Sequence, residues 1–90
     1  MKSILVTTQH RGVFFAQVEE GADLTLKTLT NLKNCRMAIY WGTTKGVMQL
    51  ANEGPTPSSK IGAPADIDVL HDITGVFNVT DKAAEKWSIV

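Results

Sequence analysis

The sequence has a single cysteine, no net charge and no long apolar run, and each of these absences excludes a class of protein. One cysteine cannot form an internal disulfide, which is typical of a reducing compartment. Nine basic residues balance nine acidic ones, so bulk basicity gives no argument for binding to nucleic acid or to an anionic membrane. No stretch approaches the roughly 18 apolar residues that span a bilayer, and the first residues lack the apolar core of a signal peptide. We therefore expect a cytoplasmic protein with no membrane partner.

The sequence also lacks the motifs of common catalytic and cofactor-binding sites. It contains no GxxxxGK[ST] phosphate loop, no GxGxxG after a strand, no HExxH and no CxxC. Ser58-Ser59-Lys60 lacks the SxxK spacing of an activated serine and lies in a proline-rich stretch. Cys35 opens an apolar run, which predicts a buried and inert thiol, and His71 is expected at the surface or in a turn. These observations predict a protein that is not an enzyme and that holds no metal and no cofactor.

The composition favours strands, and the length of 90 residues favours a single domain. Val, Ile and Thr make up 24 of the residues, and such β-branched side chains pack well on a pleated sheet. Short apolar or alternating runs between turn residues predict strands. The predicted strands are Ser3–Thr8, Val13–Val18, Leu24–Leu29, Cys35–Trp41, Val47–Ala51, Ile67–Leu70 and Ile73–Val79.

Turn residues predict how these strands are connected. Gln9–Gly12 is typical of a hairpin connection, and the glycine-bounded turn Gly42–Gly46 makes Val47–Ala51 the hairpin partner of the preceding strand. That preceding strand is apolar on both faces and is expected to be central, after a polar break with the sequence TNLKN. Gly75 is expected at a bulge or a close crossing.

Residues Asn52–Asp66 have a different composition, because they contain all three prolines of the chain. Proline fixes φ and removes a donor from the backbone ladder, so this stretch is predicted to be a loop of about 15 residues rather than a central strand. We expect the loop to be mobile, or to become ordered only on binding, with Ile61 exposed within it.

The end of the chain is predicted to form a short helix, over about residues 81–88. Either Thr80 or Asp81 can accept a hydrogen bond from an amide of the first turn. Ala83 and Trp87 lie four residues apart on one face, so Trp87 is expected to be the buried anchor. The fold class is therefore mainly β (a β-rich α+β protein), namely a small, strongly bent antiparallel sheet or an SH3-like or OB-like barrel with one short C-terminal helix. A split α+β sheet is the alternative.

Polar and aromatic residues are concentrated in two of the predicted turns, around Gln9–Gly12 and Tyr40–Gly46. Aromatic residues and arginine contribute much of the binding energy at protein interfaces. Exposed bases at such turns predict the rim of a surface for an acidic protein patch or a phosphate-bearing ligand. The candidate binding residues are His10, Arg11, Tyr40, Trp41, Thr43, Thr44, Lys45 and Lys60. The alternative is that Tyr40 and Trp41 alternate faces, with one in the core and the other partly covered.

Small barrels also bind single-stranded nucleic acid through aromatic platforms with a basic rim. Zero net charge and an aromatic content of 7% count against this class. The residues that would serve it are Arg11, Lys27, Lys33, Arg36, Lys45, Tyr40 and Trp41.

The strings TTQHRGVFFAQV, RMAIYWGTTKGVMQLANEGPT, SSKIG and LHDITGVFNVT resemble a family of small uncharacterised proteins encoded by phages and prophages. The resemblance covers nearly the whole chain. It implies a stand-alone domain of about this length that acts in an infected bacterial cell or in the virion, and it implies no activity and no catalytic residue.

From this resemblance we expect a non-enzymatic accessory protein in the host cytoplasm. It would be a β-rich interaction module that binds and inhibits a host defence or metabolic factor. The first alternative is a structural or decoration protein of the virion. The second is a small barrel that binds a nucleotide or single-stranded nucleic acid. A homo-oligomer is compatible with each of these functions.

Overall fold

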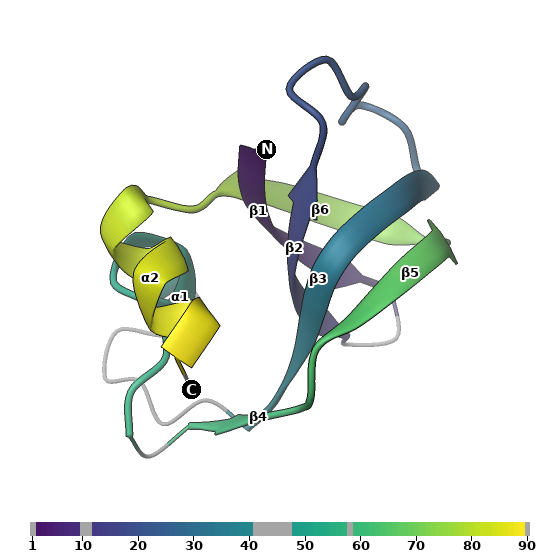
Figure 1. Ribbon diagram of the computed structural model, residues 1–90. Helices are drawn as coiled ribbons and strands as arrows, with labels where there is room; N and C mark the ends of the chain where they lie inside the picture. Colours follow the sequence, from purple (N-terminus) through teal and green to yellow (C-terminus); the bar gives the residue numbers. More distant parts are fainter. Residues whose placement is uncertain (1, 10–11, 41–47, 58, 90) are drawn as a thin grey trace.

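The computed structural model describes residues 2–9, 12–40, 48–57 and 59–89, and these form six strands and two short helices (Figure 1). The paired strands are all antiparallel and form one sheet, with β5 beside β3 and the order β4-β3-β2-β1-β6 elsewhere. The prediction of a mainly β protein is confirmed. The elements are β1 (Lys2–Thr8), β2 (Val13–Val18), β3 (Leu29–Tyr40), α1 (Met48–Asn52), β4 (Lys60–Ile61), β5 (Ala65–Leu70), β6 (Ile73–Asn78) and α2 (Asp81–Ile89).

The sheet is bent and open within the described residues. β5 and β6 follow each other in the chain and are separated only by His71 and Asp72, yet they lie at opposite edges of the sheet, β5 beside β3 and β6 beside β1. The sheet must therefore curve so that its two edges approach each other, and Figure 1 shows this curvature on the side away from the helices. No pairing joins β5 to β6 in the part of the chain that the structure describes, so the sheet is not closed into a barrel there.

Two asparagines bend β3 and explain why its first half did not look like a strand in the sequence. Asn31 and Asn34 have φ values of 57° and 52°, in the left-handed region that asparagine tolerates better than most residues. Leu29, Leu32 and Cys35 are three residues apart and nevertheless face the same cluster. The register with β5 shifts once, between Leu32 and Cys35, as at a bulge, and Asn34 lies in that interval. The polar run predicted as a break is therefore part of the strand.

The prediction of a strand over Leu24–Leu29 is wrong except at its last residue. Asp23 Oδ1 accepts hydrogen bonds from the amide and the hydroxyl of Thr25, at 3.0 and 2.6 Å, and this local turn competes with an extended backbone. The segment that follows touches β6 by one backbone bond, from Ile73 N to Lys27 O at 2.8 Å. It does not form a ladder.

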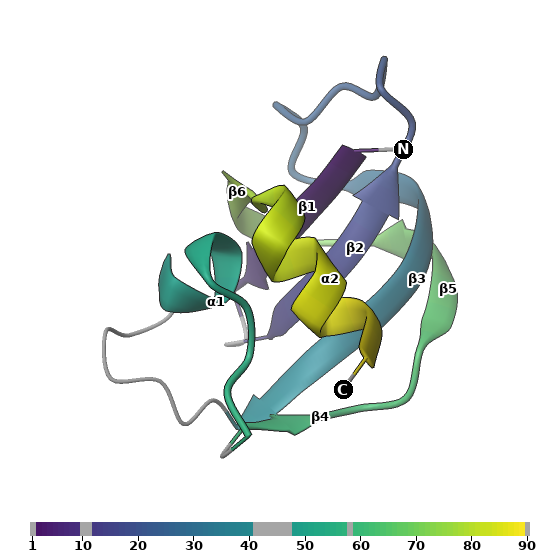
Figure 2. The same cartoon turned by 60° about the vertical axis from the view of Figure 1, so that its left-hand side comes forward.

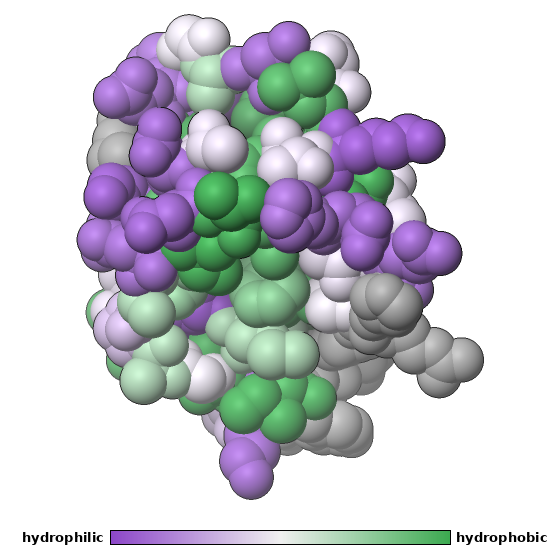
Figure 3. Space-filling model, turned by 90° about the vertical axis from the view of Figure 1, so that its right-hand side faces the viewer, coloured by the Kyte–Doolittle hydropathy of each residue, from purple (hydrophilic) through white to green (hydrophobic). Residues whose placement is uncertain are grey.

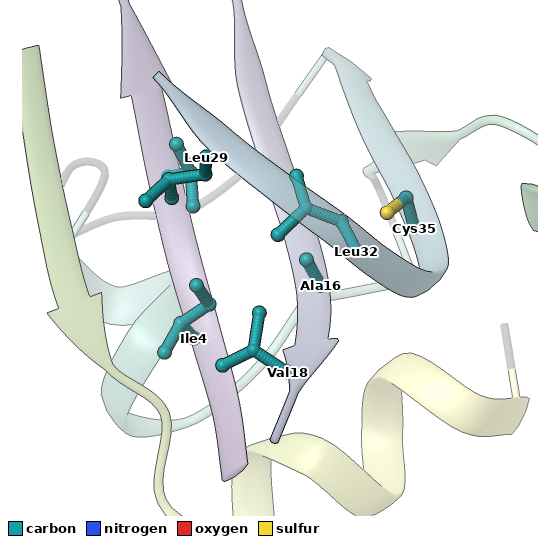
Figure 4. Packing of buried hydrophobic residues seen from close by; sticks show 7 residues of the cluster. Ile4, Ala16, Val18, Leu29, Leu32 and Cys35 are labelled. Carbon is teal, nitrogen blue, oxygen red and sulfur yellow. The ribbon is translucent and has the colours of Figure 1, made fainter. Parts of the chain in front are cut away.

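The first hydrophobic cluster fills the concave side of the bent sheet. Figure 4 shows its side chains projecting from β1, β2 and β3 into one space. Half-buried residues of β5 and β6, among them Ile67 and Val76, pack against it from the two edges. Its buried members are Ile4, Val6, Ala16, Val18, Leu29, Leu32 and Cys35.

The second hydrophobic cluster lies on the opposite face, where α2 crosses the sheet and α1 lies beside it (Figure 2). The predicted anchor is confirmed, since Trp87 is fully buried and its Nε1 donates to Leu50 O of α1 at 3.0 Å. Ala83 is buried on the same face, as predicted. Thr80 caps the helix, because its Oγ1 accepts from Ala83 N at 3.1 Å.

The predicted strand Val47–Ala51 is wrong, since Met48–Asn52 form α1. Leu50 and Ala51 of this helix are buried in the second cluster. A short apolar run fits a strand and a buried helical turn equally well. The helical turn docks on α2, where the Leu50 carbonyl provides the hydrogen-bond acceptor that the buried Trp87 indole needs. The turn Gly42–Gly46 lies outside the described residues.

The stretch Asn52–Asp66 is more structured than predicted. It contains the end of α1, the short strand β4 and the start of β5. Gly54 and Pro55 are buried, and a Cβ at Gly54 would lie 2.8 Å from Lys86 Cβ, so the chain packs tightly on α2 there. Ile61 is half-buried against the second cluster, not exposed. Its packing follows from the pairing of β4 with β3.

Two smaller predictions are also settled. The predicted strand Ile67–Leu70 lies within β5, which begins at Ala65. The predicted strand Ile73–Val79 corresponds to β6, which ends one residue earlier, at Asn78. Gly75 lies opposite Thr7, beside a register shift between Thr7 and Thr8, as expected for a bulge. No helix in the described ranges is long and apolar enough to cross a membrane.

Candidate functional site

Of the eight predicted binding residues, the structure describes Lys60 and the backbone of Tyr40, and it places these two side by side. Tyr40 at the end of β3 is the register partner of Lys60 in β4, although they are far apart in the sequence. Lys60 is exposed. Only the backbone of Tyr40 belongs to the described part. The other predicted residues lie outside the described ranges, and they are His10, Arg11, Trp41, Thr43, Thr44 and Lys45.

An exposed apolar surface lies beside this pair, on the concave side of β2 and β3. Met37 and Ile39 alternate with the buried Ala38, and they are 43% and 55% exposed. Phe14 of β2 is the register partner of Met37 and is half-buried. We call Phe14, Met37 and Ile39 the β2–β3 apolar surface. It continues the face of Cys35, but β5 has left the edge of β3 by this point, so no strand of the described part covers it.

The space-filling view gives this surface its context. Figure 3 shows apolar side chains in a band down the face that includes β5, with hydrophilic residues on both sides of its upper half. Single exposed apolar side chains are common, whereas a contiguous apolar band with polar flanks is typical of interaction surfaces. Methionine adapts its shape to different partners, which suits such a surface.

Sequence reasoning missed the β2–β3 apolar surface because it treated residues 35–41 as a strand covered on both faces. The apolar pattern was correct, and β3 does pair on both edges. The apolar pattern of residues 35–41 does not indicate which face of the strand is covered by another part of the chain. That depends on where β5 leaves β3, which is set by residues some 30 positions further along the chain.

Arg36 supports the fold near this surface and does not act as part of an open basic rim. Its Nε donates to Gly62 O and its Nη1 to Trp87 O, both at 2.9 Å. These bonds tie β3 to the chain after β4 and to the last turn of α2, where a cation also compensates the helix dipole. The suggestion that Arg36 serves a nucleic-acid rim is therefore not supported by its bonding. Lys33 lies 3.6 Å from Asp66 in an exposed ion pair.

The aromatic rings of the described core offer no open stacking platform. Phe15 is 4% exposed and Trp87 is fully buried, and the two rings stack on each other. A groove of about 230 Å³ runs beside them between α2 and the sheet, bordered by Gln17, Asn34 and Arg36. Asn34 Nδ2 already donates to Gln17 Oε1 at 2.8 Å, so much of this groove's polar wall bonds to itself.

The predicted burial of Cys35 and the predicted surface turn position of His71 are confirmed. Cys35 is 3% exposed, and burial raises the pKa of its thiol. His71 is exposed in the turn between β5 and β6, where its Nδ1 lies 3.2 Å from Thr28 Oγ1. No group of three or more potential metal-ligating side chains occurs within the described ranges.

The molecule is thus a small, mainly β domain whose open bent sheet carries two helices on one face and an apolar surface on the other. A family model described as a Domain of unknown function (DUF6948) matches residues 1–87, and the chain belongs to this family. The comparisons with curated proteins and with solved structures returned no match.

Proposed function

We propose that this protein is a non-enzymatic phage or prophage accessory protein that binds a host protein through the β2–β3 apolar surface and inhibits it. One observation carries the proposal, namely the exposure of Met37 and Ile39 on the same face of an internal strand. Burying both side chains in an interface would contribute about 1 kcal/mol each, since burying such a side chain completely is worth roughly 1.5–3 kcal/mol. The resemblance to phage and prophage proteins supports the biological setting.

The partner is proposed to carry an acidic patch. Lys60 is exposed at the edge of the surface, beside the backbone of Tyr40. A charge at the rim of an interface mainly accelerates association and is screened by salt, while apolar contacts at the centre slow dissociation. In this proposal Arg11 and Lys45 also belong to the charged rim, and Trp41 contributes apolar contact at the centre of the interface.

The test is a pull-down from bacterial lysate with the wild-type protein and two matched variants. Ile39→Asp places a carboxylate in the proposed interface, whereas Ile89→Asp makes the same change on α2, on the opposite face of the sheet, at a residue that is 80% exposed. We expect Ile39→Asp to weaken capture of the partner at least about tenfold, which corresponds to ~1.4 kcal/mol, and Ile89→Asp to leave it unchanged. Circular dichroism should show that both variants remain folded.

A captured partner must then lose activity when the wild-type protein is added and keep it when Ile39→Asp is added. Equal capture by all three proteins would place binding elsewhere. Mass spectrometry of purified particles separates the virion alternative, because a decoration protein would be present in many copies. Binding to short oligonucleotides with a steep salt dependence would favour the nucleic-acid class instead.

A further inference from the structure

A hollow of about 310 Å³ lies at the end of β2, beneath the loop of residues 19–28 that leads into β3. In Figure 1 this loop extends beyond the sheet at the end opposite β4. The hollow is therefore separate from the β2–β3 apolar surface and shares no residue with it. Its volume is near the lower end of the range found for small-molecule sites.

The base of the hollow is apolar because it is the end of the first hydrophobic cluster. Val18 and Leu29 are 2% and 4% exposed and belong to this cluster (Figure 4). Leu24, from the loop, packs against the same cluster and is half-buried. Val18 and Leu29 are already almost fully buried, so the apolar surface open to a ligand belongs to Leu24 and to Leu26, which also lines the hollow and is 54% exposed.

The loop that covers the hollow is held at both of its ends. Near its start, Ala22 N donates to Glu19 O at 3.1 Å, and Thr25 bonds to Asp23. Near its end, the backbone bond from Ile73 to Lys27 fixes the loop to β6. The hollow is thus formed by anchored backbone and is largely preformed, which lowers the entropic cost of binding.

The charge of its lining has one sign. Glu19 and Asp23 are exposed and line the hollow, and among the residues that the structure describes its other polar lining residues are neutral, with no lysine or arginine. The Thr25 hydroxyl and then the Thr25 amide lower the pKa of Asp23, so this carboxylate is ionised at neutral pH. Two carboxylates beside an apolar base favour a positively charged group attached to an apolar body.

We propose that this hollow binds a small organic cation with an apolar body, of the aryl-alkyl amine type. The apolar body lies on Leu24 and Leu26, above the buried Val18 and Leu29, and the ammonium group lies beside the carboxylates of Glu19 and Asp23. This site is independent of the proposed function, so either one stands if the other fails.

The test uses phenethylamine as the cationic probe and phenethyl alcohol as its neutral counterpart, with binding followed in amide NMR spectra of the full chain. We expect the amine to shift resonances of residues 18–31 and to bind more tightly than the alcohol. Glu19→Gln and Asp23→Asn remove one charge each while keeping the size and an acceptor oxygen. Each should weaken amine binding about two- to fivefold, as for an exposed ion pair, and leave alcohol binding unchanged.

Glu85→Gln is the matched control, because Glu85 is an exposed carboxylate on α2, away from the hollow. It should leave the affinity for the amine unchanged. A second variant, Ala22→Phe, fills the hollow from its exposed edge and should abolish binding of both probes. Equal affinity for amine and alcohol would overturn the proposal, as would equal binding by the double variant E19Q/D23N and the wild type. Shifts confined to residues outside 18–31 would also overturn it.

Discussion

The ring of Trp87 in α2 stacks on the ring of Phe15 in β2, with the centroids 5.2 Å apart and 13° between the planes. The same indole donates a hydrogen bond to Leu50 O of α1, so one side chain joins both helices to the sheet. Offset stacking of this kind contributes about 0.5–1.5 kcal/mol beyond the area that is buried. The helical layer therefore depends on one residue near the end of the chain.

Substitution Trp87→Ala should lower the free energy of unfolding by roughly 3–5 kcal/mol, because it leaves a cavity and an unpaired carbonyl at Leu50. Urea denaturation followed by circular dichroism measures the change. Trp87→Phe keeps most of the apolar contact and loses the hydrogen bond, so its loss should be smaller. A midpoint that Trp87→Ala barely moves would show that α2 contributes little to stability.

Substitution Asn31→Val should destabilise the protein by about 1–2 kcal/mol, because a β-branched residue is strained at a φ of 57°. Asn31→Gly should leave stability unchanged or raise it slightly. Thr30→Val is the control, since Thr30 is the exposed neighbour in β3 and its φ is not positive. Thermal unfolding distinguishes the three variants, and equal losses for the two valine substitutions would contradict backbone strain at position 31.

Substitution Thr80→Ala removes two hydrogen bonds of one hydroxyl. Thr80 Oγ1 accepts from Ala83 N and donates to Asn52 O at 2.8 Å, which connects the start of α2 to the end of α1. Loss of a helix cap costs about 0.5–2 kcal/mol, and we expect a value in the upper half of this range. Thr80→Ser retains both bonds and should be close to the wild type in chemical denaturation.

The stability should fall in alkaline solution because of Cys35. Burial raises the pKa of its thiol above the ordinary value of 9.0, so the folded state holds the proton more tightly than the unfolded state. The resulting stabilisation is fully present below that value and is lost as the pH rises through the raised pKa. Denaturation curves at rising pH should show this loss, and Cys35→Ala should remove that part of the pH dependence. The folded thiol should also react slowly with a disulfide reagent and rapidly in urea.

Local patterns in the sequence were sufficient to predict several elements. The strands β1 and β2 follow from apolar runs on either side of a hairpin turn, and α2 follows from a capping threonine and a tryptophan at helical spacing. Such patterns act between residues close in the chain, so neighbouring side chains suffice to predict them. The burial of Cys35 and the surface position of His71 belong to the same group.

Other features depended on residues that are distant in the sequence. Asn31 and Asn34, with their positive φ values, lie in the part of β3 that pairs with β5, and α1 docks on α2 through the bond from Trp87 to the Leu50 carbonyl. The exposure of Met37 and Ile39 likewise depends on where β5 leaves the edge of β3.

By itself, the sequence determined a small β-rich domain with a C-terminal helix anchored by tryptophan, because these features follow from the spacing of apolar residues and from one cap. Only the tertiary structure decided the bend of β3, the helical state of residues 48–52, and which apolar side chains remain uncovered. The physical reason is that a strand pairs, bulges or ends according to the partner at its edge. In this chain the partners of β3 lie both before and after it in the sequence.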